Sequence, residues 1–159
     1  MKVDISSDKK TDIVISALEE RYASIHKIRE RVQGICLWSL GLFAAAAGWL
    51  VQSRIHFHLS TALLIGAGTF LAYWVLRHRY FLDLEIGFKS QMRTAAKLEK
   101  ALHLYTPRFF TEDDDSLYPE KWEEAGTKTA DGNYFNKSYE LMLVGLIIFF
   151  LALALKTCI

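Results

Sequence analysis

The sequence predicts an all-α integral membrane protein with three transmembrane helices, the first two of which extend as long amphipathic helices into the cytoplasm. Three observations lead to this fold class. Three apolar stretches carry no charged residue, although 23% of the chain is charged. Basic residues gather on one side of these stretches. Apolar residues also recur at helical spacing beyond the first two stretches. The net charge of +1 favours neither nucleic acid nor an acidic partner.

The three stretches are long enough to cross a lipid bilayer. At 1.5 Å per residue, residues 34–51 and 59–76 each cover roughly 27 Å of hydrocarbon. The third apolar stretch is shorter, and Tyr139 and Lys156 at its ends extend it to residues 139–156 by reaching toward the headgroups. Buried helices of a soluble protein are the alternative, but the remaining polar residues are too few to cover all three.

The distribution of lysine and arginine predicts the orientation, because basic flanks stay in the cytoplasm. Basic residues precede the first stretch, follow the second and precede the third, whereas the short connection between the first two holds only Arg54. We therefore expect the N-terminus and residues 77–138 on the cytoplasmic side of the membrane and the C-terminus on the opposite side.

Two amphipathic helices are expected to continue the first two spans into the cytoplasm. Beyond a flexible N-terminus at residues 1–10, an apolar stripe leads into the first span, and Thr11 or Asp12 is expected to cap this helix. A second stripe leaves the second span and ends near His103, before Pro107. Residues 11–104 thus form one helical hairpin. Its thin cytoplasmic core favours burial against further copies of the chain. The two stripes are Val14, Leu18, Tyr22, Ile25, Ile28 and Val32, and Phe81, Leu84, Phe88, Met92, Ala95, Leu98 and Leu102.

Residues 105–138 differ in character from the hairpin. They contain both prolines, an acidic run at residues 112–115 and several irregularly spaced aromatic residues. Disordered linkers are poor in aromatic residues, so we expect an ordered cytoplasmic cap. Within it, residues 118–122 predict a short helix with proline in its first turn, and residues 131–133 predict a turn.

No pattern in the sequence indicates an enzyme. His56 and His58 form the only close histidine pair and lack a third metal ligand nearby, so interfacial polar residues explain them better than zinc does. The acidic run lacks calcium-loop spacing and is expected to be a solvated loop. We therefore expect no catalytic residue, no metal site and no cofactor.

Small and hydroxyl-bearing residues in the first two spans are the candidate packing or pore residues. Small residues at helical spacing let backbones approach closely, which drives helix association in lipid. They could serve packing between the hairpin's own helices or packing between protomers around a pore. The candidates are Ser39, Gly41, Ala45, Gly48, Ser60, Ala62, Gly66 and Thr69.

Arginines just inside the membrane are the candidate cytoplasmic ligand site. Arg77 and Arg79 follow the second span, and Arg29 and Arg31 precede the first at a matching depth. Ordinary anchoring of the spans explains these charges. In an oligomer, however, they would form a basic ring able to hold phosphates of a nucleotide signal or of lipid headgroups.

This layout resembles the SLATT class of small bacterial membrane effectors. A basic helix (LEERYASIHKIRERV) enters a two-span hairpin, and a second helix (RYFLDLEIGFKSQMRTAAKLEKAL) leaves it, so the resemblance covers residues 11–104. The third span and the segment before it depart from the two-span pattern. The resemblance implies an oligomeric pore-forming effector of anti-phage defence and abortive infection, silent until a nucleotide or oligonucleotide signal, or a nucleotidyltransferase-like regulator, triggers it.

The sequence thus favours a non-enzymatic, homo-oligomeric ion channel or membrane-depolarising effector of the inner membrane, in contact with lipid and with copies of itself. A passive anchor that recruits a soluble partner enzyme through residues 105–138 is the alternative. A membrane enzyme that uses the acidic run is a third hypothesis.

Overall fold

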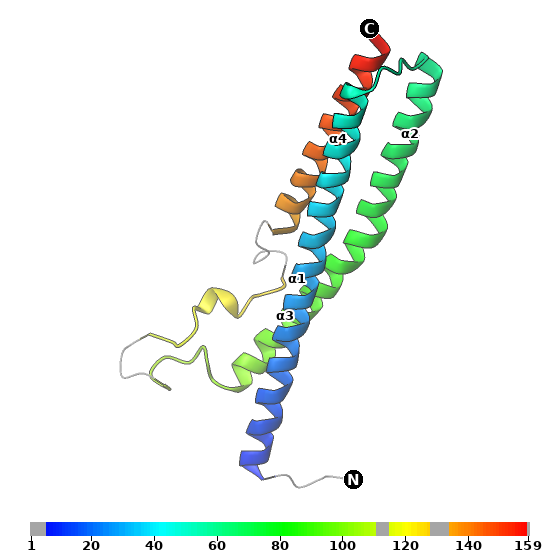
Figure 1. The fold of residues 1–159 in the computed structure, drawn as a ribbon. Coiled ribbons are helices and arrows are strands. Elements are labelled where there is room, and N and C mark those ends of the chain that lie inside the picture. The colour runs from blue at the N-terminus through cyan, green and yellow to red at the C-terminus, as the bar shows by residue number, and fades with distance from the viewer. Residues whose placement is uncertain (1–5, 111–114, 128–133, 159) are drawn as a thin grey trace. The chain divides into compact units, whose positions relative to one another are not determined.

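The computed structural model describes residues 6–110, 115–127 and 134–158, and every regular element in these ranges is helical. The long helices are α1 (Ser7–Gln52), α2 (Leu59–Val75), α3 (Leu82–Ala101) and α4 (Tyr134–Cys158) (Figure 1). A π-helix, Leu76–Phe81, joins α2 to α3, and a 3₁₀ helix spans Glu120–Trp122. Three helices are long and apolar enough to cross a membrane, which agrees with the three predicted spans.

The chain divides into two compact units. The arm unit comprises Met1–Arg29 and Glu85–Gly132, and the span unit comprises Glu30–Leu84 and Asn133–Ile159. Helices α1 and α3 contribute residues to both units. The predicted turn at residues 131–133 and most of the acidic run fall outside the described residues; Asp115, the last residue of that run, is exposed.

In the span unit, α4 packs against both other long apolar helices. Its buried side chains form one apolar cluster with α1 and α2. Gly145 permits close approach of α4 to α1, because a Cβ placed there would lie 3.1 Å from Leu40 Cδ1 and 3.3 Å from Leu40 Cα. The cluster consists of Ala47, Leu50, Ala62, Phe149, Ala152 and Leu153.

Hydrogen bonds connect both ends of α4 to α1 or to the residues that follow it. The Lys156 ammonium donates a hydrogen bond to the Ser53 carbonyl oxygen at 2.7 Å. At the other end of the helix, the Cys36 thiol donates to the Ser138 carbonyl oxygen at 3.5 Å. The third span is therefore an integral part of the helical bundle.

In the arm unit, α1 and α3 pack through their apolar residues. Leu18, Ile25 and Ala95 are buried together, with Phe88 and Met92 among the partly buried neighbours. Every one of these residues belongs to the apolar stripes of the sequence. The segment after α3 returns to this pair of helices, where the Arg93 guanidinium Nε donates to the Gly126 carbonyl oxygen at 2.5 Å.

The predicted N-terminal cap is wrong, whereas the helix end predicted near His103 lies close to the observed end of α3 and has a cause other than Pro107. Helix α1 begins at Ser7, and Thr11 lies in its first turn, where its hydroxyl donates to the Ser7 carbonyl oxygen at 3.2 Å. Thr11 and Asp12 are therefore not caps. Helix α3 ends at Ala101 because His103 adopts a left-handed conformation (φ 59°) and Leu104 N–H donates back to the Glu99 carbonyl oxygen. This hydrogen-bond pattern terminates helices before Pro107 is reached.

Candidate functional site

Helix α1 exposes its small residues on the side that its own chain leaves uncovered. Gly41, Ala45 and Gly48 are all exposed, and a Cβ added to either glycine would meet nothing within 4 Å. Their neighbours Trp38 and Leu42 are 82% and 69% exposed. Packing within the described chain therefore does not use this small-residue face, hereafter the open face of α1.

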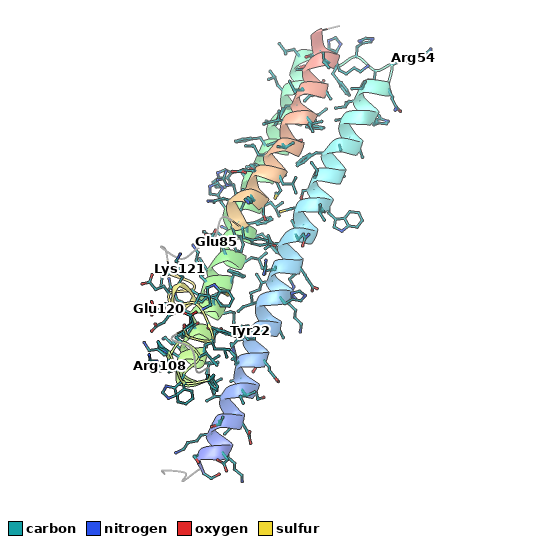
Figure 2. The ribbon with its side chains drawn as sticks, turned by 90° about the vertical axis from the view of Figure 1, so that its left-hand side faces the viewer. Tyr22, Arg54, Glu85, Arg108, Glu120 and Lys121 are labelled. Carbon is teal, nitrogen blue, oxygen red and sulfur yellow. The ribbon has the colours of Figure 1, made fainter. Side chains whose placement is uncertain are left out.

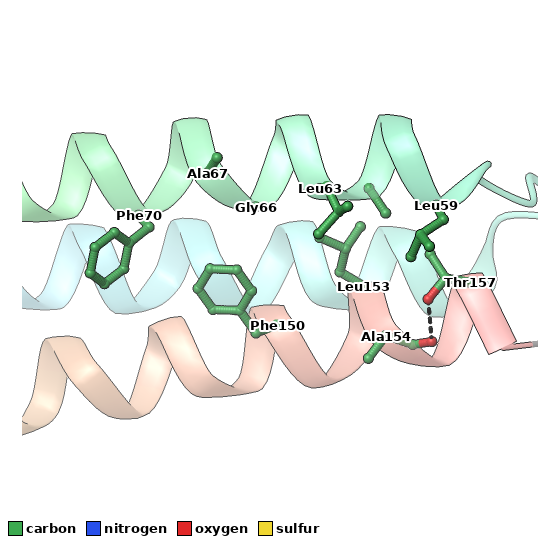
Figure 3. Close-up of a pocket in the computed structure, with 10 residues that line it drawn as sticks. Leu59, Leu63, Gly66, Ala67, Phe70, Phe150, Leu153, Ala154 and Thr157 are labelled. Atoms are coloured by element: carbon green, nitrogen blue, oxygen red, sulfur yellow. Dashed lines mark hydrogen bonds between the residues drawn. The ribbon is translucent and has the colours of Figure 1, made fainter.

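The small residues of α2 have the opposite surroundings. Ala62 and Gly66 are buried, and a Cβ on Gly66 would lie 3.1 Å from Phe150 Cε1 of α4. Both residues line an apolar cavity of about 440 Å³ between α2 and α4 (Figure 3). The two sets of small residues predicted from sequence thus separate: the α2 set packs within the chain, and the α1 set does not.

Two of the three hydroxyl candidates meet in a second cavity of the span unit. Ser39 of α1 and Thr69 of α2 both line this space of about 360 Å³, together with Tyr73. Ser60 is exposed and does not line either cavity. The Thr69 hydroxyl donates to the Ile65 carbonyl oxygen at 2.8 Å, as hydroxyls of membrane helices commonly do.

Tyr73 is a residue of this cavity that the sequence interpretation missed. Its side chain is buried, and its hydroxyl has no hydrogen-bond partner among the described residues. An unpartnered hydroxyl in an apolar environment costs about 2–7 kcal/mol, depending on the reference state. The sequence signal for Tyr73 was a tyrosine within an apolar stretch, because a buried tyrosine usually needs a hydrogen-bond partner for its hydroxyl.

The four candidate arginines are divided between the two units of the chain. Arg29 belongs to the arm unit, whereas Arg31, Arg77 and Arg79 belong to the span unit and are exposed. The Arg77 guanidinium lies 5.2 Å above the ring centroid of Tyr139, a cation–π contact that holds it against α4. Arg77 and Arg79 are two positions apart on one helix, a spacing that turns side chains away from each other.

The arm unit buries a carboxylate that the sequence interpretation did not single out. Glu99 is 6% exposed and accepts hydrogen bonds from the hydroxyls of Tyr22, at 2.5 Å, and Tyr105. Burial, followed by hydrogen bonding to Glu99, raises the pKa of Tyr22 and of Tyr105 above the ordinary tyrosine value. Glu99 continues the spacing of Met92 and Ala95, so the apolar stripe itself was the signal that could have found it.

Aromatic residues of the cap surround this carboxylate. Tyr118 packs edge-on against Tyr105 and Trp122, with ring centroids 6.2 and 5.4 Å apart. Lys100 and Glu123 form an ion pair that links α3 to the segment after the 3₁₀ helix. These contacts pack the described part of the cap against α3, and the helix predicted at residues 118–122 is a 3₁₀ helix, Glu120–Trp122, that follows Pro119.

No arrangement of metal ligands is evident in the described part of the chain, where no three histidine, cysteine or acidic side chains gather. His56 and His58 are both exposed.

No protein-family model, curated protein or solved structure matches this chain.

Proposed function

We propose that this protein is a non-enzymatic, homo-oligomeric channel or membrane-depolarising effector of the bacterial inner membrane, in which the arm unit responds to a cytoplasmic ligand or partner. The observation that carries the proposal is the open face of α1. The three apolar helices pack together, yet Gly41, Ala45 and Gly48 of the first span face away from the rest of the described chain.

In lipid, an uncovered face of small residues favours association with another helix. Apolar side chains gain little from leaving lipid, so helices associate where small residues permit close backbone contact. Gly41, Ala45 and Gly48 follow one another at spacings of four and three, which places them on one side of α1. A second copy of α1 is the simplest partner for such a face.

Polar groups inside the span unit support a conducting role. Ser39, Thr69 and Tyr73, which each carry a hydroxyl, line one cavity between apolar helices. Hydroxyl groups can replace part of the hydration shell of a passing ion or water molecule. The 360 Å³ cavity would become part of a pathway when copies of the span unit assemble.

The orientation and the biological setting are part of the same proposal. Basic flanks favour a cytoplasmic arm unit and a periplasmic C-terminus. The resemblance to SLATT effectors favours a role in anti-phage defence, with a nucleotide signal or a nucleotidyltransferase-like regulator as the trigger. The candidates for phosphate binding are Arg29, Arg31, Arg77 and Arg79, of which the last three belong to the span unit and are exposed.

Leakage from liposomes tests this function. Purified protein reconstituted into liposomes should release a trapped potassium-sensitive dye, alone or after addition of the trigger. Gly48→Leu should reduce release at least about ten-fold, because a bulky side chain separates the helices that small residues bring together. Gly68→Leu is the matched control, since a Cβ on Gly68 of α2 also meets nothing within 4 Å. Equal release by both variants contradicts the proposed interface.

A membrane scaffold is the second candidate function. Phe109, Phe110 and Leu117 of the cap are each at least half exposed, and apolar side chains gathered on a cytoplasmic segment are typical of protein docking surfaces. A scaffold should be inert without its partner, so expression of the chain alone distinguishes the two. Depolarised cells favour the effector, and normal growth with no liposome leakage favours the scaffold.

A further inference from the structure

A cavity of about 310 Å³ opens in the arm unit beside the buried Glu99. Its walls come from three elements: Tyr22 of α1, Met92 and Glu99 of α3, and Lys121 and Trp122 of the 3₁₀ helix. Figure 2 labels Tyr22 on α1 and Lys121 on the cap. The volume is at the lower end of the range that holds small organic ligands.

The carboxylate in this cavity is buried and has no ion-pair partner among the described residues. Its two hydrogen-bond donors, the hydroxyls of Tyr22 and Tyr105, are neutral. A carboxylate can accept about four hydrogen bonds, so roughly half of its capacity is unused. Among the described residues, no basic side chain forms an ion pair with Glu99. Buried glutamates are usually paired with a positive charge, because desolvation disfavours an isolated one.

The other walls suit a positively charged group. Tyr22 and Trp122 supply aromatic rings, a residue type that attracts cations through the ring quadrupole, and Met92 supplies a polarisable thioether. An anion would meet the charge of Glu99. A metal ion would find too few oxygen ligands, since the described residues bring no group of three acidic, histidine or cysteine side chains together.

We propose that this cavity binds a small organic ammonium group, with Glu99 as its counter-charge and Tyr22 and Trp122 as its aromatic walls. The ligand would contact both arms and the cap at once, so its binding stabilises the docked cap. The site rests on the arm unit alone and does not depend on the proposed channel activity. Lys121 is exposed and carries a competing positive charge at the cavity.

Titration calorimetry on the full chain in detergent tests the site. Butylammonium chloride and tetramethylammonium chloride are the probes, and sodium butyrate and potassium chloride are the controls for a negative headgroup and for ionic strength. At least one ammonium probe should bind saturably at one site per chain, and butyrate should not. The absence of saturable binding by both ammonium probes, or equal binding of butyrate, overturns the proposal.

Three variants identify the residues responsible. Glu99→Gln keeps the side-chain shape and should weaken binding at least about ten-fold, because it removes a charged hydrogen-bond acceptor. Lys121→Ala should tighten binding, since it removes the competing charge without disturbing a buried group. Glu120→Gln neutralises the neighbouring exposed carboxylate, which does not line the cavity, and should leave binding unchanged.

Thermal unfolding of each variant distinguishes a loss of ligand binding from a folding defect. If Glu99→Gln lowers the melting temperature of the arm unit, the Lys121→Ala result decides, because that side chain is exposed. Unchanged affinity in both Glu99→Gln and Lys121→Ala places the probe elsewhere and ends the proposal.

Discussion

Gly126 is the residue whose replacement should most disturb the arm unit. Its φ of +78° is rarely adopted by other residues, and a Cβ would lie 2.5 Å from the Lys89 carbonyl oxygen and 2.8 Å from Arg93 Cγ. Gly126→Ala should therefore cost about 2 kcal/mol or more and release the cap. The fluorescence of Trp122 during denaturant unfolding measures this loss.

Gly87 provides the matched control for this substitution. It lies inside α3, and an added Cβ would be 4.0 Å from Ile28 Cδ1, an ordinary contact. Gly87→Ala should leave the arm unit unchanged or stabilise it by up to about 1 kcal/mol, because alanine favours the helix. Equal stability of the two variants would show that the cap does not dock at Gly126.

The tyrosines around Glu99 make the docked cap sensitive to alkali. Their raised pKa keeps Tyr22 and Tyr105 protonated when folded, whereas in the unfolded chain they ionise around the ordinary value of 10.0. The unfolded state then binds fewer protons, so stability is constant below about pH 10 and falls as the pH rises further. Chemical unfolding at several pH values, followed through Trp122, measures this dependence.

Tyrosine variants assign the alkaline loss to these side chains. Tyr105→Phe should lower stability at neutral pH by about 1.5–3 kcal/mol, the worth of a hydrogen bond to a charged group, and flatten the alkaline decline. Tyr80→Phe removes an exposed tyrosine of the span unit and should change neither. A decline that is identical in Tyr105→Phe and the parent protein contradicts the assignment.

The sequence predicted some of these residues and not others. Ser39 and Thr69 could be named because hydroxyls stand out in apolar spans, and they meet in one cavity. Glu99 was missed because one acidic residue in a helix with many charged residues looks like an ordinary solvent-exposed residue. Its burial depends on Tyr105 and Trp122, which approach α3 only after the chain has turned back at His103.

At the scale of elements, the small residues of α1 and α2 should have separable effects. Gly66 contacts Phe150 of α4, so Gly66→Leu should destabilise a single chain by overpacking. Gly48 has open space around it, so Gly48→Leu should leave the stability of one chain unchanged and affect assembly. Thermal melting by circular dichroism and chemical cross-linking in membranes measure the two effects. Loss of stability in Gly48→Leu contradicts the open face of α1.

Helix positions were more predictable than helix ends. The uncharged stretches place all three long apolar helices, since composition over many residues sums to a strong signal. The start of α1 at Ser7 and the end of α3 at Ala101, before the left-handed His103, depend on local backbone geometry that composition does not reveal. The π-helix at Leu76–Phe81 was not predicted either, because its sequence alone does not distinguish the wider hydrogen-bonding pattern from an α-helix.

At the scale of the whole molecule, the third helix changes the interpretation of the hairpin. The resemblance to two-span effectors covers residues 11–104, and α4 lies beyond it. Yet α4 supplies Phe149 and Leu153 to the main apolar cluster of the span unit. Helix α4 occupies the small-residue side of α2, whereas the open face of α1 is left uncovered by the described chain and is where we propose that another copy packs.

The mass of the purified protein in detergent tests the central claim, self-association through α1, most directly. Light scattering during size-exclusion chromatography gives the protein mass of the particle separately from that of the detergent. The account predicts one discrete multiple of the chain mass, which Gly48→Leu lowers and Gly68→Leu preserves. A particle containing a single chain at every protein concentration would contradict it.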